Sequence, residues 1–194
     1  MTETRKAKTS KSRAERDSKR SIRFGAALQA VGARTILRLP DATSKELPSR
    51  GQVAVRGALN GLPFETVIEP DGDSGHWMSV DVKLQERAGV GPGDQADVAI
   101  EPTEEWPEPS LPADLRAALS TASQEIKELW HAITPMARWE WVRWVNATRS
   151  PGTRKRRVEV SISKMSSGKR RPCCFNLASC TDPELAKNGK LVLV

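Results

Sequence analysis

A stretch rich in proline and glutamate constrains the fold of this chain more than any other sequence feature. Residues 101–112 hold four prolines and four glutamates. Proline fixes φ and lacks a backbone N–H, so this composition favours an extended connection over a helix or a strand. The sequence therefore predicts one module at residues 24–101 and a second at residues 112–176, joined by a linker at residues 102–111.

The charge of the chain changes sign from segment to segment. Residues 1–23 carry nine basic and three acidic residues. Residues 24–110 carry seven basic and 14 acidic residues, and residues 111–194 carry 15 basic and seven acidic residues. The first segment is almost devoid of apolar residues, so we expect a disordered basic tail that cannot offset the entropy of ordering. The alternation supports separate modules, but the basic ends can also attract the acidic middle of the same molecule or of a second copy.

Composition narrows the location of the protein. No stretch of about 18 apolar residues occurs, so we expect no membrane span. The basic start lacks the apolar region of a secretory signal, because arginines interrupt the segment from Ile22 to Leu39. Three cysteines cannot form a closed disulfide framework, which fits a reducing compartment. These features predict a cytoplasmic protein.

Short apolar runs predict a β-rich first module. They lie at Ile22–Val31, Thr35–Leu39, Gln52–Leu59, Leu62–Glu69, Trp77–Val82 and Asp97–Ile100. Asn60-Gly61, between two of these runs, readily takes the positive φ angles of a tight hairpin turn. Lys83–Ala88 fits one short helix. Several short strands in so small a module favour a barrel-like closed sheet, which removes exposed edges.

The second module is predicted to be helical, which makes the whole chain α+β. Residues 112–120 and 122–133 suit two helices, and Thr134-Pro135 is a typical start for a third. In that third helix one apolar stripe predicts a core. The stripe comprises Ala137, Trp141, Trp144, Val145 and Thr148. Trp139 lies off the stripe, so we expect it at the surface or at a domain contact.

The structure of the next segment is ambiguous from its pattern alone. Ser150-Pro151-Gly152 predicts a break, after which Thr153 can cap a new element. Val158, Val160 and Ile162 alternate like a strand, whereas Val158, Ile162 and Met165 also fit a helix. Residues 177–194, which end in Leu191-Val192-Leu193-Val194, are assigned as a C-terminal extension.

A dense basic cluster is the main candidate binding site. The residues that we select, together with Trp139, are Arg149, Arg154, Arg156, Arg157, Lys169, Arg170 and Arg171. Lys155 and Lys164 lie among them. Such a cluster can bind an acidic protein, a nucleic acid or another polyanion, with an affinity that falls as salt rises. It can equally be a solvated face that pairs with local acids or with the acidic first module.

No catalytic or metal site is predicted. His76 and His131 fall in different modules, so a nucleophile and base would have to assemble across the linker. Cys173, Cys174 and Cys180 lack the paired spacing of zinc ligands. The Asp71–Gly75 segment begins like a calcium loop but lacks the later ligands, so it predicts a turn. We therefore assign no cofactor and no metal, and we find no set of residues that indicates an enzyme.

Two motif regions resemble known families. Residues 153–158 (TRKRRV) and 168–175 (GKRRPCCF) resemble the YdeI/OmpD-associated family, as do residues 111–115 (LPADL) and the Trp141–Trp144 region upstream of them. Residues 59–64 (LNGLPF), with His76 and Gly93-Asp94, look like the small all-β domain of unknown function that often precedes this module. The resemblance implies a helix for the basic segment and a role in bacteriocin protection or stress in bacteria. It implies no catalytic residue and no cofactor.

Three functional hypotheses follow. The first is a non-enzymatic binding or adaptor protein of bacterial stress or bacteriocin tolerance, which engages an acidic partner through the basic helical face. The second is a nucleic-acid-binding protein that uses the basic tail and the basic helix. The third is a small-ligand-binding protein or an enzyme that uses a cavity of the β-domain.

Overall fold

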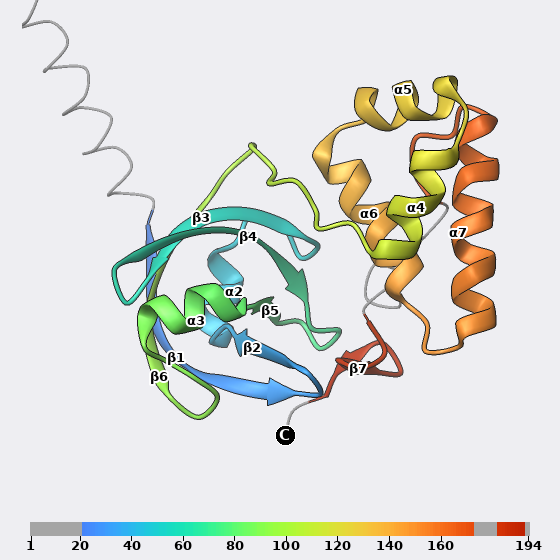
Figure 1. The fold of residues 1–194 in the computed structure, drawn as a ribbon. Coiled ribbons are helices and arrows are strands. Elements are labelled where there is room, and N and C mark those ends of the chain that lie inside the picture. The colour runs from blue at the N-terminus through green and yellow to red at the C-terminus, as the bar shows by residue number, and fades with distance from the viewer. Residues whose placement is uncertain (1–20, 173–181, 193–194) are drawn as a thin grey trace, which may run out of the picture.

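A computed structural model of the chain describes residues 21–172 and 182–192. A closed β-barrel precedes four helices, so the predicted α+β class and the order of its parts are confirmed (Figure 1). Residues 1–20 of the predicted tail lie outside the described residues, as do Cys173, Cys174 and Cys180. The last residues assigned to the tail, Ile22 and Arg23, instead belong to the barrel, where they pair with Ile100 and Ala99.

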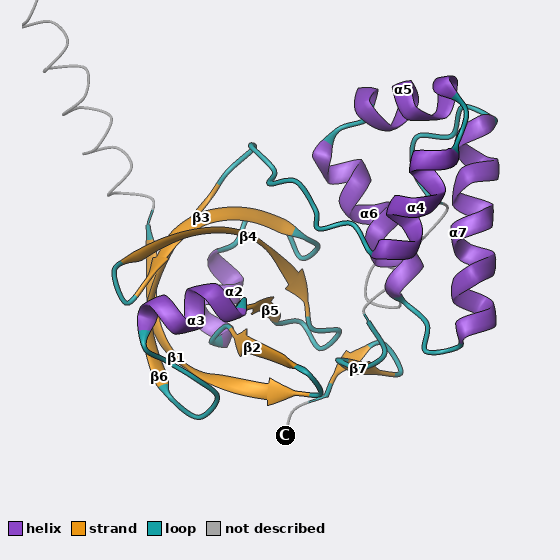
Figure 2. Cartoon of the chain, in the orientation of Figure 1, coloured by secondary structure: helices purple, strands orange, loops and turns teal. Residues whose placement is uncertain are grey.

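Six antiparallel strands close the barrel in the order β1-β2-β5-β4-β3-β6 (Figure 2). Their bounds are Ile22–Val31 (β1), Arg34–Arg38 (β2), Val53–Leu59 (β3), Leu62–Pro70 (β4), His76–Ser79 (β5) and Gln95–Pro102 (β6). Pairing of β1 with β6 completes the closure, so these strands leave no long unpaired edge. All six predicted strands form. The largest shift is in β5, which ends at Ser79 because the chain turns into a helix at Val82.

The β3–β4 hairpin turns at Asn60-Gly61, as the sequence predicted. The φ angles of these residues are 48° and 80°, and a type I′ turn requires positive values at both positions. Leu59 pairs with Leu62 directly across the turn. The Asn60 side-chain oxygen also accepts a hydrogen bond from the Asp97 N–H at 2.9 Å, which ties the turn to β6.

Apolar side chains fill the interior of the barrel. The buried set includes Leu28, Leu37, Val55, Leu59, Ile68, Met78, Val98 and Ile100. Helix α3 (Val82–Ala88) adds Leu84, whose N–H is capped by Asp81 at 2.9 Å. The sequence did not predict the short helix α2 (Asp41–Glu46) that follows β2. In the described part of the chain the interior is thus a packed core, not the ligand cavity that the third hypothesis required.

Four helices form the second module around a tryptophan. They are α4 (Ala113–Thr121), α5 (Gln124–Ala132), α6 (Pro135–Asn146) and α7 (Pro151–Ser166). Helix α6 begins as predicted, because Thr134 accepts a hydrogen bond from the Ala137 N–H and Pro135 occupies the first turn. Trp141 is fully buried, and half-buried Trp144 packs beside it edge to face, with ring centroids 6.1 Å apart. The predicted core stripe is therefore correct at both tryptophans.

The basic segment is a helix, which confirms what the family resemblance implied for Val158. Its N-cap differs from the prediction. Ser150, not Thr153, caps α7, because the Ser150 hydroxyl accepts the Thr153 N–H at 3.3 Å and Pro151 stands in the first turn. Val158 and Met165 belong to the helical core. Ser161, which lies between them in the sequence, is also buried.

The C-terminal extension returns to the barrel. Strands β7 (Ala186–Lys187) and β8 (Lys190–Leu191) form a short hairpin that the sequence did not predict (Figure 1). Leu185, just before β7, is fully buried against Ile36 and Trp77. The Leu191 N–H donates a hydrogen bond to the Asp71 carbonyl at 2.8 Å. The extension therefore covers part of the outer face of the barrel.

Candidate functional site

Helix α6 presents two different faces to the rest of the protein. Ala137, Trp141 and Val145 belong to the helical core. A second set, spaced at i, i+3, i+4 and i+7, shares another face of the helix. It consists of Trp139, Val142, Arg143 and Asn146, all of which line a cleft against the barrel.

This junction cleft is walled by both modules. Glu69 of β4 and Trp77 of β5 are direct cross-strand partners, so their side chains lie on the same face of the barrel, and Ser79 follows Trp77 on that face. The linker contributes Ser110 and Leu111, Pro112 follows at the start of the second module, and the C-terminal extension contributes Asp182 and Leu185. The cleft has a volume of about 460 Å³. This value falls within the range of about 300–1,000 Å³ that is typical of small-molecule sites.

A buried ion pair crosses the junction. Arg143 Nε donates a hydrogen bond to Glu69 Oε2 at 2.8 Å, and the two side chains are only 6% and 14% exposed. Burial raises the pKa of Glu69 above its ordinary value, and the opposing effect of Arg143 is smaller. Removing one member of such a pair is costly because the other charge stays buried. The pair therefore fixes α6 over β4.

A second ion pair lines the same cleft. Arg34 Nη2 lies 2.6 Å from Asp182 Oδ2, which joins β2 to the C-terminal extension. Both residues also act on Glu69, since Arg34 lowers its pKa and Asp182 raises it. Among the described residues, two positive and two negative side chains thus line the cleft, and their formal charges cancel.

Two tryptophans contribute to the cleft. Trp139 Nε1 donates a hydrogen bond to the Pro107 carbonyl at 2.7 Å, which attaches the linker to α6. The prediction that Trp139 lies at a domain contact is therefore correct. Trp77 is buried, and its Nε1 has no acceptor among the residues that the structure describes.

The predicted basic site is largely engaged inside the helical module. Arg154 binds Asp114 through two hydrogen bonds, from Nε at 2.6 Å and from Nη2 at 3.0 Å. These bonds lower the pKa of the Asp114 carboxyl. Arg171 Nε lies 3.1 Å from Glu140 Oε2. Such pairs match the interpretation of the basic cluster as a face that is neutralised by local acids.

Other members of the basic set bind backbone carbonyls or an aromatic ring. Arg157 donates to the Trp144 carbonyl at 2.7 Å, and its guanidinium lies 5.5 Å from the Trp144 ring centroid. Lys164 lies 5.6 Å from the same ring. Arg170 donates to the Ala132 carbonyl at 3.0 Å, and Arg149 donates to the Pro183 carbonyl. These cations therefore hold the module and the C-terminal extension together.

Three exposed cations of the cluster differ from the exposed Arg149, Arg170 and Arg171, because no partner of their side chains lies in the described part of the chain. Lys155, Arg156 and Lys169 make no side-chain hydrogen bond or ion pair within residues 21–172 and 182–192. We call these three residues the exposed cationic patch. It is much smaller than the basic site that the sequence predicted, and none of its members lines the junction cleft.

Comparison with known families covers both modules. Residues 24–100 match the family described as Domain of unknown function (DUF1905), and residues 108–168 match the family described as Bacteriocin-protection, YdeI or OmpD-Associated. The chain joins a DUF1905 domain to a YdeI/OmpD-associated module. The order of the two agrees with the resemblance seen in the sequence. A comparison with curated proteins found no match.

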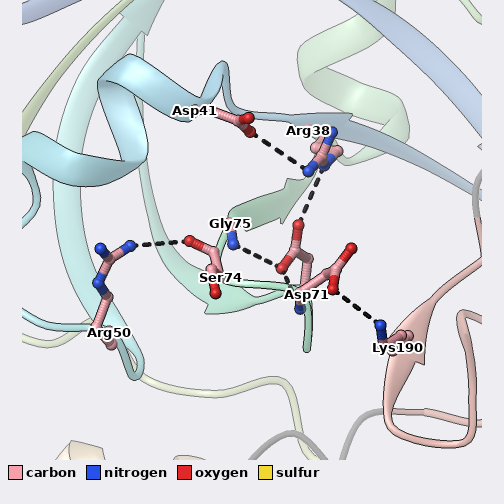
Figure 3. Close-up of polar contacts among 8 residues, drawn as sticks. Arg38, Asp41, Arg50, Asp71, Ser74, Gly75 and Lys190 are labelled. Atoms are coloured by element: carbon pink, nitrogen blue, oxygen red, sulfur yellow. Dashed lines mark hydrogen bonds and ion pairs between the residues drawn. The ribbon is translucent and has the colours of Figure 1, made fainter.

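In the DUF1905 domain, Asp71 organises the turn between β4 and β5. Its Oδ1 accepts hydrogen bonds from the N–H groups of Asp73 and Gly75 at 2.8 Å each. Its Oδ2 accepts a hydrogen bond from Arg38 Nε at 3.1 Å (Figure 3). Burial raises the pKa of Asp71, but the hydrogen bonds together hold it below its ordinary value. Lys190 of β8 pairs with Asp73 at 2.9 Å. The segment is thus the turn that the sequence predicted, with the C-terminal hairpin attached to it.

The two histidines lie in different modules, as the sequence indicated. His76 is fully buried in the DUF1905 domain, with Nε2 3.2 Å from the Gly51 carbonyl, and burial lowers its pKa. His131 is exposed on α5 of the YdeI/OmpD-associated module. Within the described ranges, no group of three or more His, Cys, Asp or Glu side chains could hold a metal ion. No described helix combines the length and apolar character needed to cross a membrane.

Sequence reasoning found Trp139 but missed the charges of the junction cleft. Two weak signals were present. Glu69 ends the predicted strand Leu62–Glu69 on the face that should be solvated, and Arg143 stands beside Val142 on a second stripe of α6. Neither signal indicates by itself that the two residues meet, because 74 positions separate them.

Proposed function

We propose that the protein is a binding protein of bacteriocin tolerance or the associated stress response, and that its ligand occupies the junction cleft. The observation that carries this proposal is the cleft itself, with walls from both modules and charged side chains at its surface. The description of the second family as bacteriocin-protection proteins supports the bacteriocin-related role. The predicted cytoplasmic location, which rests on the sequence alone, is part of the same proposal.

Docking of an acidic protein on the exposed cationic patch is the second candidate. The observation in its favour is that Lys155, Arg156 and Lys169 are exposed and make no described intramolecular pair. Three cations give a small patch, whereas binding of a nucleic acid typically neutralises several phosphates at once. The patch therefore supports an acidic protein partner more than a nucleic acid, and a gel shift at low and high salt distinguishes the two.

A cleft-blocking substitution tests the first candidate. Ser79 is exposed and lines the junction cleft, so Ser79→Trp should fill the space without removing a core contact. Ser163→Trp, on the exposed side of α7, is the matched control. A compound library is screened by thermal shift against the wild-type protein and both variants. A ligand at about 100 times its Kd adds about 2.7 kcal/mol to the stability of the folded state.

The expected result is that compounds which stabilise the wild-type protein and Ser163→Trp fail to stabilise Ser79→Trp. Equal stabilisation of Ser79→Trp would place the bound compound elsewhere and contradict the proposal. A library without any stabilising compound would also contradict it.

The cellular role is tested by bacteriocin challenge. Bacteria that produce the wild-type protein or Ser163→Trp should survive, and bacteria that produce Ser79→Trp should be sensitive. A variant in which Lys155, Arg156 and Lys169 are all replaced by glutamine tests the second candidate. Loss of protection in this triple variant, with protection retained by Ser79→Trp, would identify the cationic patch as the functional surface instead.

A further inference from the structure

We propose that the junction cleft recognises a small zwitterion with an apolar side chain, such as an aromatic amino acid or a short peptide. This inference rests on the proposed function and adds the chemical class of the ligand. Three properties of the cleft carry it: a guanidinium with donors to spare, a carboxylate oxygen with acceptor capacity to spare, and an apolar wall beside them.

Arg34 supplies the site for a carboxylate. Its Nη2 binds Asp182 Oδ2, and its side chain is 41% exposed. The Arg34 side chain makes no other hydrogen bond in the described part of the chain, so its Nε and Nη1 donors remain available to a ligand in the cleft. A guanidinium has five N–H donors in a planar fork and can bind a carboxylate through two of them. Arg34 can therefore hold a ligand carboxylate while it keeps its pair with Asp182.

Glu69 supplies the site for an ammonium group. Its Oε2 is occupied by Arg143 Nε at 2.8 Å, whereas Oε1 makes no hydrogen bond within the described residues. The other carboxylate of the cleft is more fully engaged, because Asp182 binds Arg34 through Oδ2 and accepts the Glu184 N–H through Oδ1 at 3.0 Å. Glu69 Oε1 is therefore the acceptor to which we assign the ammonium group of the ligand.

Charge balance favours a ligand that carries both signs. Arg34 and Arg143 are offset by Glu69 and Asp182 along the cleft, and two of these side chains are almost completely shielded from water. A ligand with a net charge would leave one charge uncompensated in this environment, which is expensive. A zwitterion adds one charge of each sign and keeps the balance. A phosphate or nucleotide, with several negative charges beside two carboxylates, does not.

An apolar wall accommodates the rest of the ligand. The carbon-rich lining side chains are Leu111, Trp139, Val142 and Leu185. Because Trp139 Nε1 is already bonded to the Pro107 carbonyl, its ring contributes apolar surface to the cleft rather than a hydrogen bond. The volume of about 460 Å³ leaves room for an aromatic side chain. Sites of this kind combine an apolar lining with a few polar groups that orient the ligand.

Calorimetric titration of the full chain with a truncated series tests the ligand class. The probes are L-phenylalanine, phenylacetate, which lacks the ammonium group, and 2-phenylethylamine, which lacks the carboxylate. Glycyl-L-phenylalanine separates a peptide from a free amino acid, and inorganic phosphate tests for a simple anion site. L-phenylalanine or the dipeptide should bind at least about tenfold more tightly than either truncated probe, as expected for loss of a charged hydrogen bond.

Charge-specific variants separate recognition from general damage to the cleft. Arg34→Gln should weaken L-phenylalanine binding by about tenfold or more but should not weaken 2-phenylethylamine, because it leaves Asp182 without its cationic partner. Glu69→Gln should weaken L-phenylalanine similarly but should not weaken phenylacetate, because it leaves the positive charge of Arg143 without its carboxylate partner. Arg87→Gln, at an exposed arginine of α3 outside both the cleft and the cationic patch, is the matched control and should bind every probe as the wild-type protein does. A misfolded cleft would instead lose all probes together.

Several outcomes overturn the ligand class. A truncated probe that bound as tightly as both L-phenylalanine and the dipeptide would contradict it, as would wild-type affinity for L-phenylalanine in a folded Arg34→Gln variant. Binding of phosphate or 2-phenylethylamine alone, abolished by Ser79→Trp, would overturn the zwitterion but leave the cleft as the functional site. If neither these probes nor the compound library bound, both the ligand class and the proposed function would fall.

Discussion

Replacing Arg143 by methionine removes the positive member of the buried ion pair and leaves Glu69 in place. The two side chains are 6% and 14% exposed, so solvent screens the pair very little. Breaking a buried pair by removing one partner typically costs about 3–5 kcal/mol. Against a total stability of about 5–15 kcal/mol for a folded protein, we expect Arg143→Met to lose a large part of the free energy of unfolding.

The destabilisation should depend on pH in a defined direction. The pKa of Glu69 is already raised above 4.5 in the folded protein, mainly by burial, and Arg143 is the largest influence that lowers it. Without Arg143 the folded-state pKa rises further, so between 4.5 and that pKa the folded state binds more protons than the unfolded state. The free energy of unfolding then falls as pH rises through this window. Arg143→Met should therefore be least destabilised at low pH, where Glu69 is neutral in both states.

Urea denaturation at about pH 5 and about pH 7.5 measures both effects. The double variant Glu69→Met with Arg143→Met should recover most of the lost stability, because a well-packed apolar pair often replaces a buried ion pair without loss. Arg156→Met is the exposed control and should change stability by less than about 0.5 kcal/mol. A loss below about 1 kcal/mol for Arg143→Met, or one that is the same at both pH values, would refute this account of the junction.

Three further predictions follow from the described contacts. Trp141→Ala should cost about 3–5 kcal/mol in urea denaturation because its side chain is fully buried, whereas half-buried Trp139→Ala should cost clearly less; equal losses would contradict the two-face description of α6. Gly57→Ala should destabilise the barrel or prevent its folding, because the new Cβ would lie 2.2 Å from the Ala99 carbonyl oxygen, and an unchanged Tm would contradict that close approach. Asp71→Asn should flatten the acid limb of the stability curve: the folded pKa of Asp71 is lowered, so its contribution is full above about pH 3.8 and is lost as pH falls below that value. If the free energy of unfolding of Asp71→Asn still fell steeply at low pH, other carboxylates would be responsible for the acid destabilisation.

Local rules in the sequence were sufficient for most secondary structure. Alternating apolar residues placed all six barrel strands, because strand side chains alternate between faces regardless of what packs on them. Asn60-Gly61 set the hairpin, and Thr134-Pro135 set the start of α6, since backbone preferences act within a few residues. The composition of the proline-rich linker likewise predicted two modules.

Family resemblance supplied what local pattern could not decide. The segment around Val158 satisfied both a strand and a helix pattern, and only the resemblance favoured the helix that the structure contains. The cap of that helix was misassigned to Thr153, because Ser150 and Thr153 have equivalent capping chemistry and the chain direction at the break selects between them.

Tertiary structure alone decided the candidate site. The basic residues between Arg149 and Arg171 read as a partner-binding face in sequence, yet most of them bind acids, carbonyls and a tryptophan ring of the same chain. The junction cleft joins residues from β2, β4, β5, the linker, α6 and the C-terminal extension. Composition and periodicity report on neighbours along the chain, whereas the Glu69–Arg143 pair depends on how two separately folded surfaces meet. The sequence determined the two modules, and their packing created the cleft.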